Sequence, residues 1–289
     1  HVYHCDFIMR SLTPKKITPK PVASNEIVSN QVSGAKQPKN SLIITSYNIH
    51  KGMSPLNRFV KMEGIAAALD QVQSDIICLQ EVQGQNLKRV VKYNEFPDQS
   101  QHEWFGEYLQ LENSYGKNVE YNHGHHGNAV LSRHPLDPKH NVNITVSRLE
   151  QRGVLHCEIQ PEGWHTPIIV LCAHLNLMEN DREKQYEVIS QYINNEIDQS
   201  TPLILAGDFN DWKKLSCQKL GCDLNLQEAV LTHHGKLLPT FPAKLPVLSL
   251  DRIYVRNLQL HRAWVHKGQP WCNLSDHLPV SAEVSLLLD

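Results

Sequence analysis

The chain has 289 residues, enough for one large domain or two small ones. With 40% hydrophobic and 20% charged residues it can bury a sizeable core, so a collagen-like or wholly disordered chain is excluded. The formal net charge of −2 argues against a protein that holds long nucleic acid by bulk charge alone, although a locally basic active site is compatible with it.

The first 40 residues differ from the rest of the chain. They are rich in Pro, Ser, Lys and Asn, carry six Lys or Arg against two acids, and lack apolar periodicity. We therefore expect a flexible basic tail over residues 1–40 and a single domain over residues 41–289. The chain begins with His1, so we expect a fragment or an engineered start. No signal segment or membrane span is visible, which predicts a cytoplasmic protein.

The rest of the chain reads mainly as strands. Helical spacing of apolar residues predicts helices at 58–73 and 181–197, and the polar, aromatic stretch 83–123 predicts a long loop with some helix. Short apolar runs predict strands at 41–49, 74–82, 128–135, 153–159, 167–175, 201–209, 249–256, 260–266 and 279–288. Several of these runs are apolar on both faces, so we expect stacked sheets covered by a few helices.

Three cysteines, Cys78, Cys157 and Cys172, lie inside apolar runs. The chain has seven cysteines in all, an odd number, and no CxxC pair. Buried, reduced thiols are therefore expected in preference to a disulfide or zinc framework.

Polar residues of chemical interest stand at the ends of the predicted strands. Each has an ordinary structural reading by itself: a surface acid, a turn, a helix cap. Together they supply carboxylates, amides and imidazoles, which suit Mg²⁺ or Mn²⁺ and phosphoester hydrolysis. Zinc is disfavoured because the set has no Cys and no HExxH. The motifs are Tyr47-Asn48-Ile49-His50, Gln80-Glu81-Val82, Ala173-His174-Leu175, Gly207-Asp208-Phe209-Asn210, Leu250-Asp251-Arg252 and Ser275-Asp276-His277.

The order of these motifs resembles the endonuclease/exonuclease/phosphatase superfamily, whose fold is that of deoxyribonuclease I. The resemblance rests on SYNIH, LQEV, GNAVLSRHP, AHL, GDFN, LDRIYV and SDHLP, and runs from about residue 42 to 286. Within the superfamily the chain is most similar to small bacterial proteins of the YbhP type, through NIHKG, GHHGNAVLSR, GDFNDW and LSDH. The resemblance implies an α/β (α+β) fold: a two-sheet β-sandwich flanked by helices in four layers, with the site at one edge.

The resemblance also implies a set of cation ligands. Glu81 would be the principal ligand of a divalent cation, Mg²⁺ or Mn²⁺, with Asn48 beside it in the metal and phosphate network. Asp276 would contact a second cation. Some nuclease relatives carry an acid at the position of His50, so the missing carboxylate puts a two-metal stoichiometry in doubt.

Catalytic roles follow from the same resemblance. His277 would be the catalytic histidine and Asp251 its orienting acid. Asp208 would position or deprotonate the attacking water, held by Asn210, and His174 would stabilise the phosphate. The division of the base role between Asp208 and His277 stays open.

Asn48, His50 and Asn128 are the candidate substrate-binding residues. His50, with Lys51, is a candidate phosphate contact, the alternative being a structural histidine. Weaker candidates are a metal cluster of His123, His125 and His126, and pocket walls formed by Trp212 and Trp271.

The leading functional hypothesis is a metal-dependent phosphodiesterase or nuclease that uses in-line attack of water. The alternatives are a phosphatase, a phospholipid headgroup phosphodiesterase of the sphingomyelinase kind, or a non-enzymatic binding module. Nucleic acid is the first candidate partner, because a basic tail and the aromatic residues of 102–121 suit it. Lys and Arg along the site would favour nucleic acid, whereas a closed pocket or an apolar lip would favour the phosphatase or phospholipid alternative.

Overall fold

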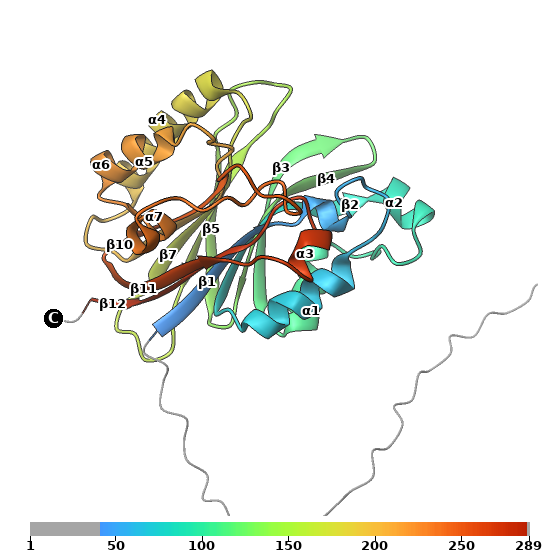
Figure 1. Ribbon diagram of the computed structural model, residues 1–289, viewed down its shortest axis with the longest axis horizontal. Coiled ribbons are helices and arrows are strands. Elements are labelled where there is room, and N and C mark those ends of the chain that lie inside the picture. The colour runs from blue at the N-terminus through green and yellow to red at the C-terminus, as the bar shows by residue number, and fades with distance from the viewer. Residues whose placement is uncertain (1–40, 288–289) are drawn as a thin grey trace, which may run out of the picture. The chain divides into compact units, whose positions relative to one another are not determined.

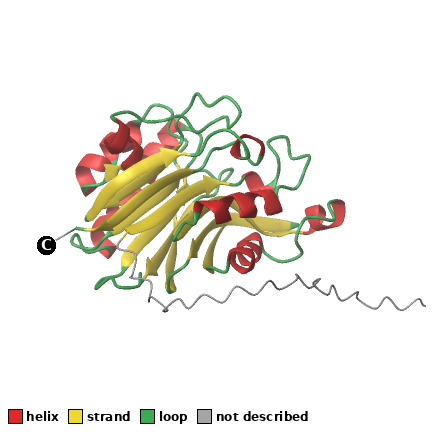
Figure 2. Ribbon diagram, turned by 60° about the horizontal axis from the view of Figure 1, so that its bottom comes forward, coloured by secondary structure: helices red, strands yellow, loops and turns green. Residues whose placement is uncertain are grey.

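The computed structural model describes residues 41–287 (Figure 1). The basic tail expected at 1–40 and residues 288–289 lie outside the described residues. Within 41–287 the chain forms two six-stranded sheets. Figure 2 shows helices on the outer faces of the strands.

The first sheet has the strand order β11-β12-β1-β2-β4-β3. Strands β1 and β2 are parallel, and the other neighbours in this sheet are antiparallel. Its strands are β1 (Ser41–Asn48), β2 (Ile76–Asn86), β3 (Glu112–Tyr121), β4 (Gly124–Ser132), β11 (Leu258–Val265) and β12 (Val280–Leu286).

The second sheet has the order β5-β6-β7-β8-β10-β9, and only β7 and β8 are parallel. Its strands are β5 (Leu136–Asn143), β6 (Gly153–Ile159), β7 (Ile168–His174), β8 (Leu203–Asp208), β9 (Gln227–Glu228) and β10 (Asp251–Arg256). The helices of the chain are α1 (Met62–Val72), α2 (Leu87–Lys92), α3 (Gln101–Leu109), α4 (Glu179–Glu196), α5 (Leu215–Lys219), α6 (Gly221–Leu224) and α7 (Ala229–His234), with 3-10 turns η1 (His50–Gly52) and η2 (Trp271–Asn273).

Strands that are apolar on both faces explain why sheets and helices stack in layers. In β8, Ile204 and Ala206 join the core between the two sheets, while Leu203 and Leu205 join a second core. Helix α4 supplies Ile189 and Ile193 to that second core. Because side chains alternate across a strand, a run apolar at every position needs a partner on both faces. A third core joins α1 and α3 to the first sheet, so the sandwich flanked by helices is confirmed.

Two strands differ from the sequence prediction. Residues 112–121, expected within a long loop, form β3, and residues 136–143, for which no element was expected, form β5. Both are edge strands, each with one neighbour in its sheet. Edge strands carry polar side chains and tolerate Pro, as β5 does at Pro138, so they lack the apolar signal used to predict strands.

The buried thiols are as expected. Cys78, Cys157 and Cys172 are buried, and all six cysteines in the described part of the chain are free. Within residues 41–287, no helix is both long and apolar enough to cross a membrane.

Candidate active site

Strand register brings three of the expected site residues into one row. His174 at the end of β7 pairs with Asp208 at the end of β8, and Asp208 pairs across the antiparallel ladder with Asp251 at the start of β10. In the first sheet, β1 ends at Asn48 beside Gln80. The polar ends of both sheets therefore lie at one edge of the sandwich.

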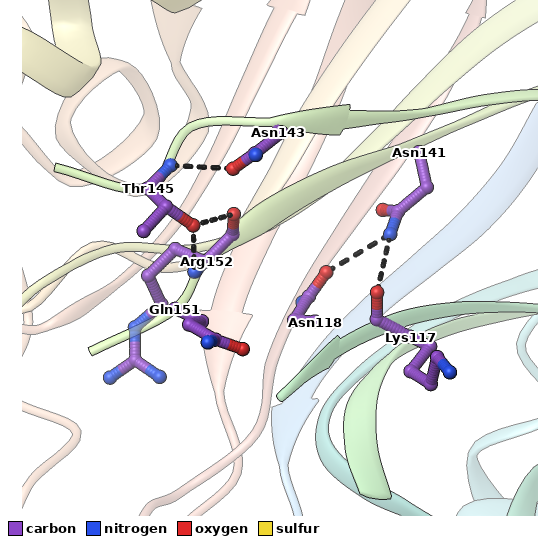
Figure 3. A pocket seen from close by; sticks show the side chains of 7 residues that line it. All are labelled: Lys117, Asn118, Asn141, Asn143, Thr145, Gln151 and Arg152. Atoms are coloured by element: carbon purple, nitrogen blue, oxygen red, sulfur yellow. Dashed lines mark hydrogen bonds between the residues drawn. The ribbon is translucent and has the colours of Figure 1, made fainter. Parts of the chain in front are cut away.

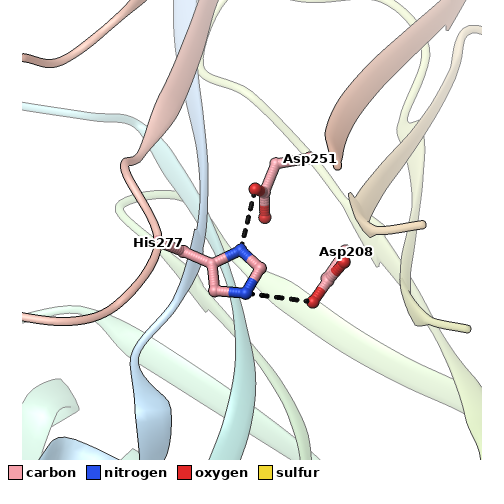
Figure 4. A group of neighbouring side chains, drawn as sticks. All are labelled: Asp208, Asp251 and His277. Atoms are coloured by element: carbon pink, nitrogen blue, oxygen red, sulfur yellow. Dashed lines mark hydrogen bonds and ion pairs between the residues drawn. The ribbon is translucent and has the colours of Figure 1, made fainter. Parts of the chain in front are cut away.

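Asp251 and His277 form a buried hydrogen-bonded pair (Figure 4). His277 Nδ1 lies 2.9 Å from Asp251 Oδ2, and Thr240 donates to the same oxygen at 2.6 Å. With Nδ1–H donated to Asp251, the opposite ring nitrogen faces Asp208 Oδ2 at 3.6 Å. Burial lowers the pKa of His277, but the negative charges of Asp251 and Asp208 outweigh burial and raise it to about 10.

Asp208 lies at the centre of the site and is 1% exposed. One carboxylate oxygen accepts from Asn48 Nδ2 at 3.0 Å and lies 3.5 Å from His174 Nε2. The other accepts from the backbone N–H of Asn210 at 2.9 Å. Burial raises the pKa of Asp208 to about 6, although the charge of His277 opposes this effect. Asp208 is therefore ionised at neutral pH but basic enough to accept a proton.

His174 is held as a neutral imidazole. Burial lowers its pKa well below the ordinary value, and the nearby guanidinium of Arg152 lowers it further. Arg152 donates from Nε to the carbonyl of Leu175 at 3.3 Å, next to His174 in the chain. A neutral His174 can donate one hydrogen bond toward the centre of the site without adding a charge.

A bulge in β2 turns Glu81 toward this centre. Between Leu79 and Val82, β2 has one residue more than its partner strand β4, and Glu81 takes a left-handed backbone conformation, φ 56°. Its carboxylate lies 3.4 Å from Asn48 Nδ2 and 3.2 Å from Lys51 Nζ. Burial raises the pKa of Glu81, but the charge of Lys51 and the surrounding imidazoles lower it well below the usual range.

The acidic donors at this edge fit a hard divalent cation. His50 Nδ1 lies 4.0 Å from Glu81 Oε2 and 3.3 Å from Asp276 Oδ2, so both carboxylates border the same small volume. Asn48 lies at the same edge: Oδ1 accepts the backbone N–H of His50 at 3.0 Å, and Nδ2 faces Glu81 Oε1 at 3.4 Å. Carboxylate oxygens are donors that Mg²⁺ and Mn²⁺ prefer, and Asn48 Oδ1 would add an amide oxygen.

Among the described residues, one group of three His, Asp or Glu side chains is close enough to share a cation. Single ligand atoms of Asp208, Asp251 and His277 lie within 4.8 Å of one another. His277 Nδ1 and Asp251 Oδ2 are already hydrogen-bonded to each other at 2.9 Å. Glu81 and Asp276 lie outside this group, so the cation site at Glu81 stays a prediction.

Two buried hydrogen bonds connect the loops that carry the predicted site residues. Asn210 Nδ2 donates to the carbonyl of Leu175 at 2.9 Å, which joins the turn after β8 to the loop after β7. Ser275 Oγ donates to the carbonyl of Asn48 at 2.7 Å, which joins the segment before β12 to the end of β1. Each of these bonds joins two segments of one sheet, and the bond from Asn48 Nδ2 to Asp208 joins the two sheets.

Asn128 makes backbone contacts, and the phosphate contact expected of it stays a prediction. Its side chain is buried, and Nδ2 donates to the carbonyls of Gly153 and Cys172 at 2.9 and 3.1 Å. This amide links the first sheet to β6 and β7 of the second, so its contacts here are structural.

The weaker candidates are distributed more widely. His123, His125 and His126 do not form a metal-binding group among the described residues, and each has an aromatic neighbour. Trp271 is buried beside Tyr47, with ring centroids 5.6 Å apart. Trp212 is 43% exposed and covers the guanidinium of Arg182 at 4.6 Å.

A polar cavity of about 360 Å³ opens between the edge strands β3 and β5 (Figure 3). Amides dominate its lining, and the two cations are Lys117 and Arg152. Because Arg152 also donates to Leu175 O, the cavity adjoins the catalytic edge beside His174. Its lining residues are Lys117, Asn118, Asn141, Asn143, Thr145, Gln151 and Arg152.

Sequence reasoning missed two residues that act on the site. Thr240 donates to Asp251, and Arg152 influences His174. Neither stands in a recognisable motif. Arg152 directly precedes the strand predicted at 153–159, but the sequence does not distinguish it from an ordinary surface arginine.

A sequence profile of the Endonuclease/Exonuclease/phosphatase family matches residues 45–277, and the chain belongs to this family. YbhP from Escherichia coli K12 is 38% identical over 246 residues, which is 85% of this chain and 97% of YbhP. The resemblance to YbhP-type proteins is therefore confirmed.

Solved structures of the same fold support the architecture. An endonuclease/exonuclease/phosphatase from Beutenbergia cavernae matches with a TM-score of 0.72 at 20% identity, over 86% of this chain and 72% of that one. D. rerio TDP2 complexed with single-strand DNA product gives 0.61 at 16% identity, over 86% and 100%. A mannosyl-6-phosphatase from Bacteroides thetaiotaomicron gives 0.64 at 15% identity, over 85% and 100%. At these identities the likeness shows the fold.

Proposed function

We propose that the chain is a divalent-metal-dependent phosphodiesterase that hydrolyses its substrate by in-line attack of water. Membership of the family supports a phosphoester hydrolase in general. The observation that carries the proposal is the position of Asp208, within 3.6 Å of two imidazole nitrogens and hydrogen-bonded to Asn48 beside the Glu81 carboxylate.

Asp208 acts as the general base in this proposal. Its pKa of about 6 lies close to neutral pH, where an ionised base still accepts a proton effectively. Asn48 and the backbone of Asn210 fix its two oxygens. His277 is a poorer base because its pKa of about 10 keeps it protonated.

His277 and His174 stabilise the phosphoryl group as its charge develops. The protonated His277 is aligned by Asp251 and offers Nε2–H toward the centre of the site. Neutral His174 offers a second donor near the same carboxylate oxygen of Asp208. Preorganised donors of this kind stabilise a transition state without reorganisation of water.

Glu81, Asn48 and Asp276 would hold the divalent cation. When bound, such an ion neutralises phosphoryl charge and polarises the P–O bond. Lys51 and His50 lie against the same carboxylates and bind phosphate oxygens in this proposal. The amide-lined cavity beside His174 accommodates a polar part of the substrate through Lys117 and Arg152.

Two features of the named structural relatives bear on the class of substrate. TDP2 is complexed with single-strand DNA product, and another relative is a mannosyl-6-phosphatase. Both substrates are phosphoesters, so a nuclease or a phosphatase remains an alternative assignment of this site. The free thiols in residues 41–287 support a reducing, cytoplasmic location.

The direct test is turnover of bis-p-nitrophenyl phosphate with Mg²⁺ or Mn²⁺. We expect hydrolysis that EDTA abolishes and the metal restores. The matched control is Glu81→Ala. If neither metal supports hydrolysis above the Glu81→Ala level, the proposed activity is wrong.

A further inference from the structure

Two loops beside the catalytic site hold apolar side chains in water. In the loop of residues 53–61, Leu56 and Phe59 are 71% and 64% exposed. In the loop of residues 240–248, Leu245 and Val247 are 75% and 67% exposed. The two loops lie side by side, because Leu56, Phe59 and Lys244 line one cavity of about 300 Å³.

Hydrogen bonds fix the backbone of both loops. In the first, Ser54 N donates to Phe59 O at 2.8 Å, and Ser54 Oγ accepts from Phe59 N at 3.2 Å. In the second, Phe241 and Leu248 exchange N–H···O bonds at 3.0 and 2.8 Å. The apolar side chains are thus held outward by ordered backbone. Burying them would recover about 25 cal/mol for each Å² of apolar surface, and adjacent apolar side chains on a surface mark a binding site.

Every charged residue in these two loops is a cation. Arg58, Lys61 and Lys244 line the shared cavity, and no Asp or Glu occurs in residues 53–61 or 240–248. This charge stands out in a chain whose formal net charge is −2. We call these seven side chains the docking face: Leu56, Arg58, Phe59, Lys61, Lys244, Leu245 and Val247.

The docking face adjoins the catalytic residues directly. Asn57 Nδ2 lies 3.2 Å from His50 Nε2, and Ala243 N donates to Asp276 O at 2.7 Å. The loop after His174 adds Leu177 and Met178, which are 56% and 67% exposed. Exposed apolar residues therefore occur in the loops that contact His50 and Asp276 and in the loop that follows His174.

The geometry points to docking of this face on a bilayer that contains anionic phospholipid, with a phospholipid as the substrate. Aliphatic side chains interspersed with Lys and Arg match the boundary between acyl chains and anionic headgroups. Nucleic acid fits less well, because Phe59 is the one aromatic side chain of this face, and Leu56, Leu245 and Val247 offer neither a donor to phosphate nor a ring on which a base could stack. This inference rests on the proposed phosphodiesterase activity. Water would add across one P–O bond of the headgroup diester and release an alcohol and a phosphomonoester.

Vesicle sedimentation tests the docking face. The full chain is mixed with phosphatidylcholine vesicles, with and without phosphatidylglycerol, and the bound fraction is measured at low and high salt. We expect binding that requires phosphatidylglycerol and weakens with salt. The variants L56S/F59S and K61Q/K244Q should each weaken it by about tenfold. The matched control is Leu287→Ser, because Leu287 is 53% exposed beyond the far end of β12.

Circular dichroism and the thermal midpoint show whether each variant is folded. Equal vesicle binding by L56S/F59S and Leu287→Ser would overturn the docking face, as would wild-type protein that binds no vesicle. Binding to single-stranded DNA that the same variants abolish would also overturn it, in favour of nucleic acid.

A second measurement separates this inference from the proposed function. Wild-type turnover of soluble bis-p-nitrophenyl phosphate tests the hydrolase alone, whereas vesicle binding is measured without turnover. Hydrolysis of phosphatidylglycerol in vesicles, absent in Asp208→Asn, then tests the substrate class. Soluble turnover without vesicle binding rejects only the inference made here. Vesicle binding without any turnover supports the docking face and rejects the hydrolase.

Discussion

Asp208 and Asp251 pair directly across the antiparallel strands β8 and β10, and both approach the same imidazole, that of His277. The two carboxylates nonetheless differ in surroundings. Asp251 accepts hydrogen bonds from His277 and Thr240, while Asp208 faces the open side of the ring. In the proposed mechanism, Asp251 therefore orients the imidazole and Asp208 accepts the proton of water.

Replacing the base should remove most of the activity. Asp208→Asn keeps the size of the side chain, but its single amide oxygen can accept only one of the two hydrogen bonds from Asn48 and Asn210, and it cannot accept the proton of water. We expect kcat to fall by about 10² to 10⁴, with an unchanged far-ultraviolet spectrum. Asp137→Asn, at an exposed carboxylate in β5, is the control. A fully active Asp208→Asn protein would refute the role of Asp208 as base.

The pH profile of kcat/KM should be bell-shaped. Activity needs ionised Asp208, so it should rise as pH increases through about 6. It also needs protonated His277, so it should fall as pH approaches about 10. Because the charge of Asp251 helps to raise the pKa of His277, Asp251→Asn should move the alkaline limb down by about 1 to 3 pH units. An alkaline limb that stays in place would show that it belongs to another group.

Removal of the Glu81 carboxylate should weaken cation binding. Glu81→Gln keeps the side chain's size but loses its charge, and we expect Mn²⁺ affinity to drop by about tenfold or more. Calorimetric titration of the protein without substrate measures this directly. The control is Glu63→Gln, on the exposed side of α1. Equal Mn²⁺ affinity in Glu81→Gln and the wild type would place the cation elsewhere.

The sequence predicted the buried strands well because apolar side chains on both faces of a strand leave a clear pattern. It missed β3 and β5, whose edge positions leave them polar. For the site, the motifs identified residues that do meet, such as Asp208, Asp251 and His277. The sequence could not supply the register that aligns His174, Asp208 and Asp251, since register depends on pairing between distant strands. The hydrogen bond from Thr240 to Asp251 likewise depends on how distant segments meet, so the sequence could not predict it.

The first 40 residues should be dispensable for chemistry. All the proposed catalytic residues lie within 48–277, so deletion of residues 1–40 should leave kcat and KM for bis-p-nitrophenyl phosphate within about twofold of the full chain. Steady-state kinetics of the two proteins make the comparison. A large loss of turnover would show that the segment belongs to the catalytic domain.

A side chain at position 207 should disturb the strand pairing that aligns His174 with Asp208. A Cβ there would overlap the backbone carbonyl oxygen of Ala173 on the neighbouring strand, one residue away from both His174 and Asp208. We expect Gly207→Ala to destabilise the fold by about 2 kcal/mol or more, because backbone on β7 cannot move aside cheaply. In a domain of this size that corresponds to a thermal midpoint lowered by about 4 to 8 °C.

Gly235→Ala is the matched control for this substitution. Gly235 also has a positive φ, 69°, but a Cβ there meets nothing within 4 Å. Its cost should therefore be limited to backbone strain of about 1 kcal/mol. The difference between the two midpoints, measured by calorimetry, isolates the overlap with Ala173. If the two variants had the same thermal midpoint, close contact between β7 and β8 would not be the reason for glycine at position 207.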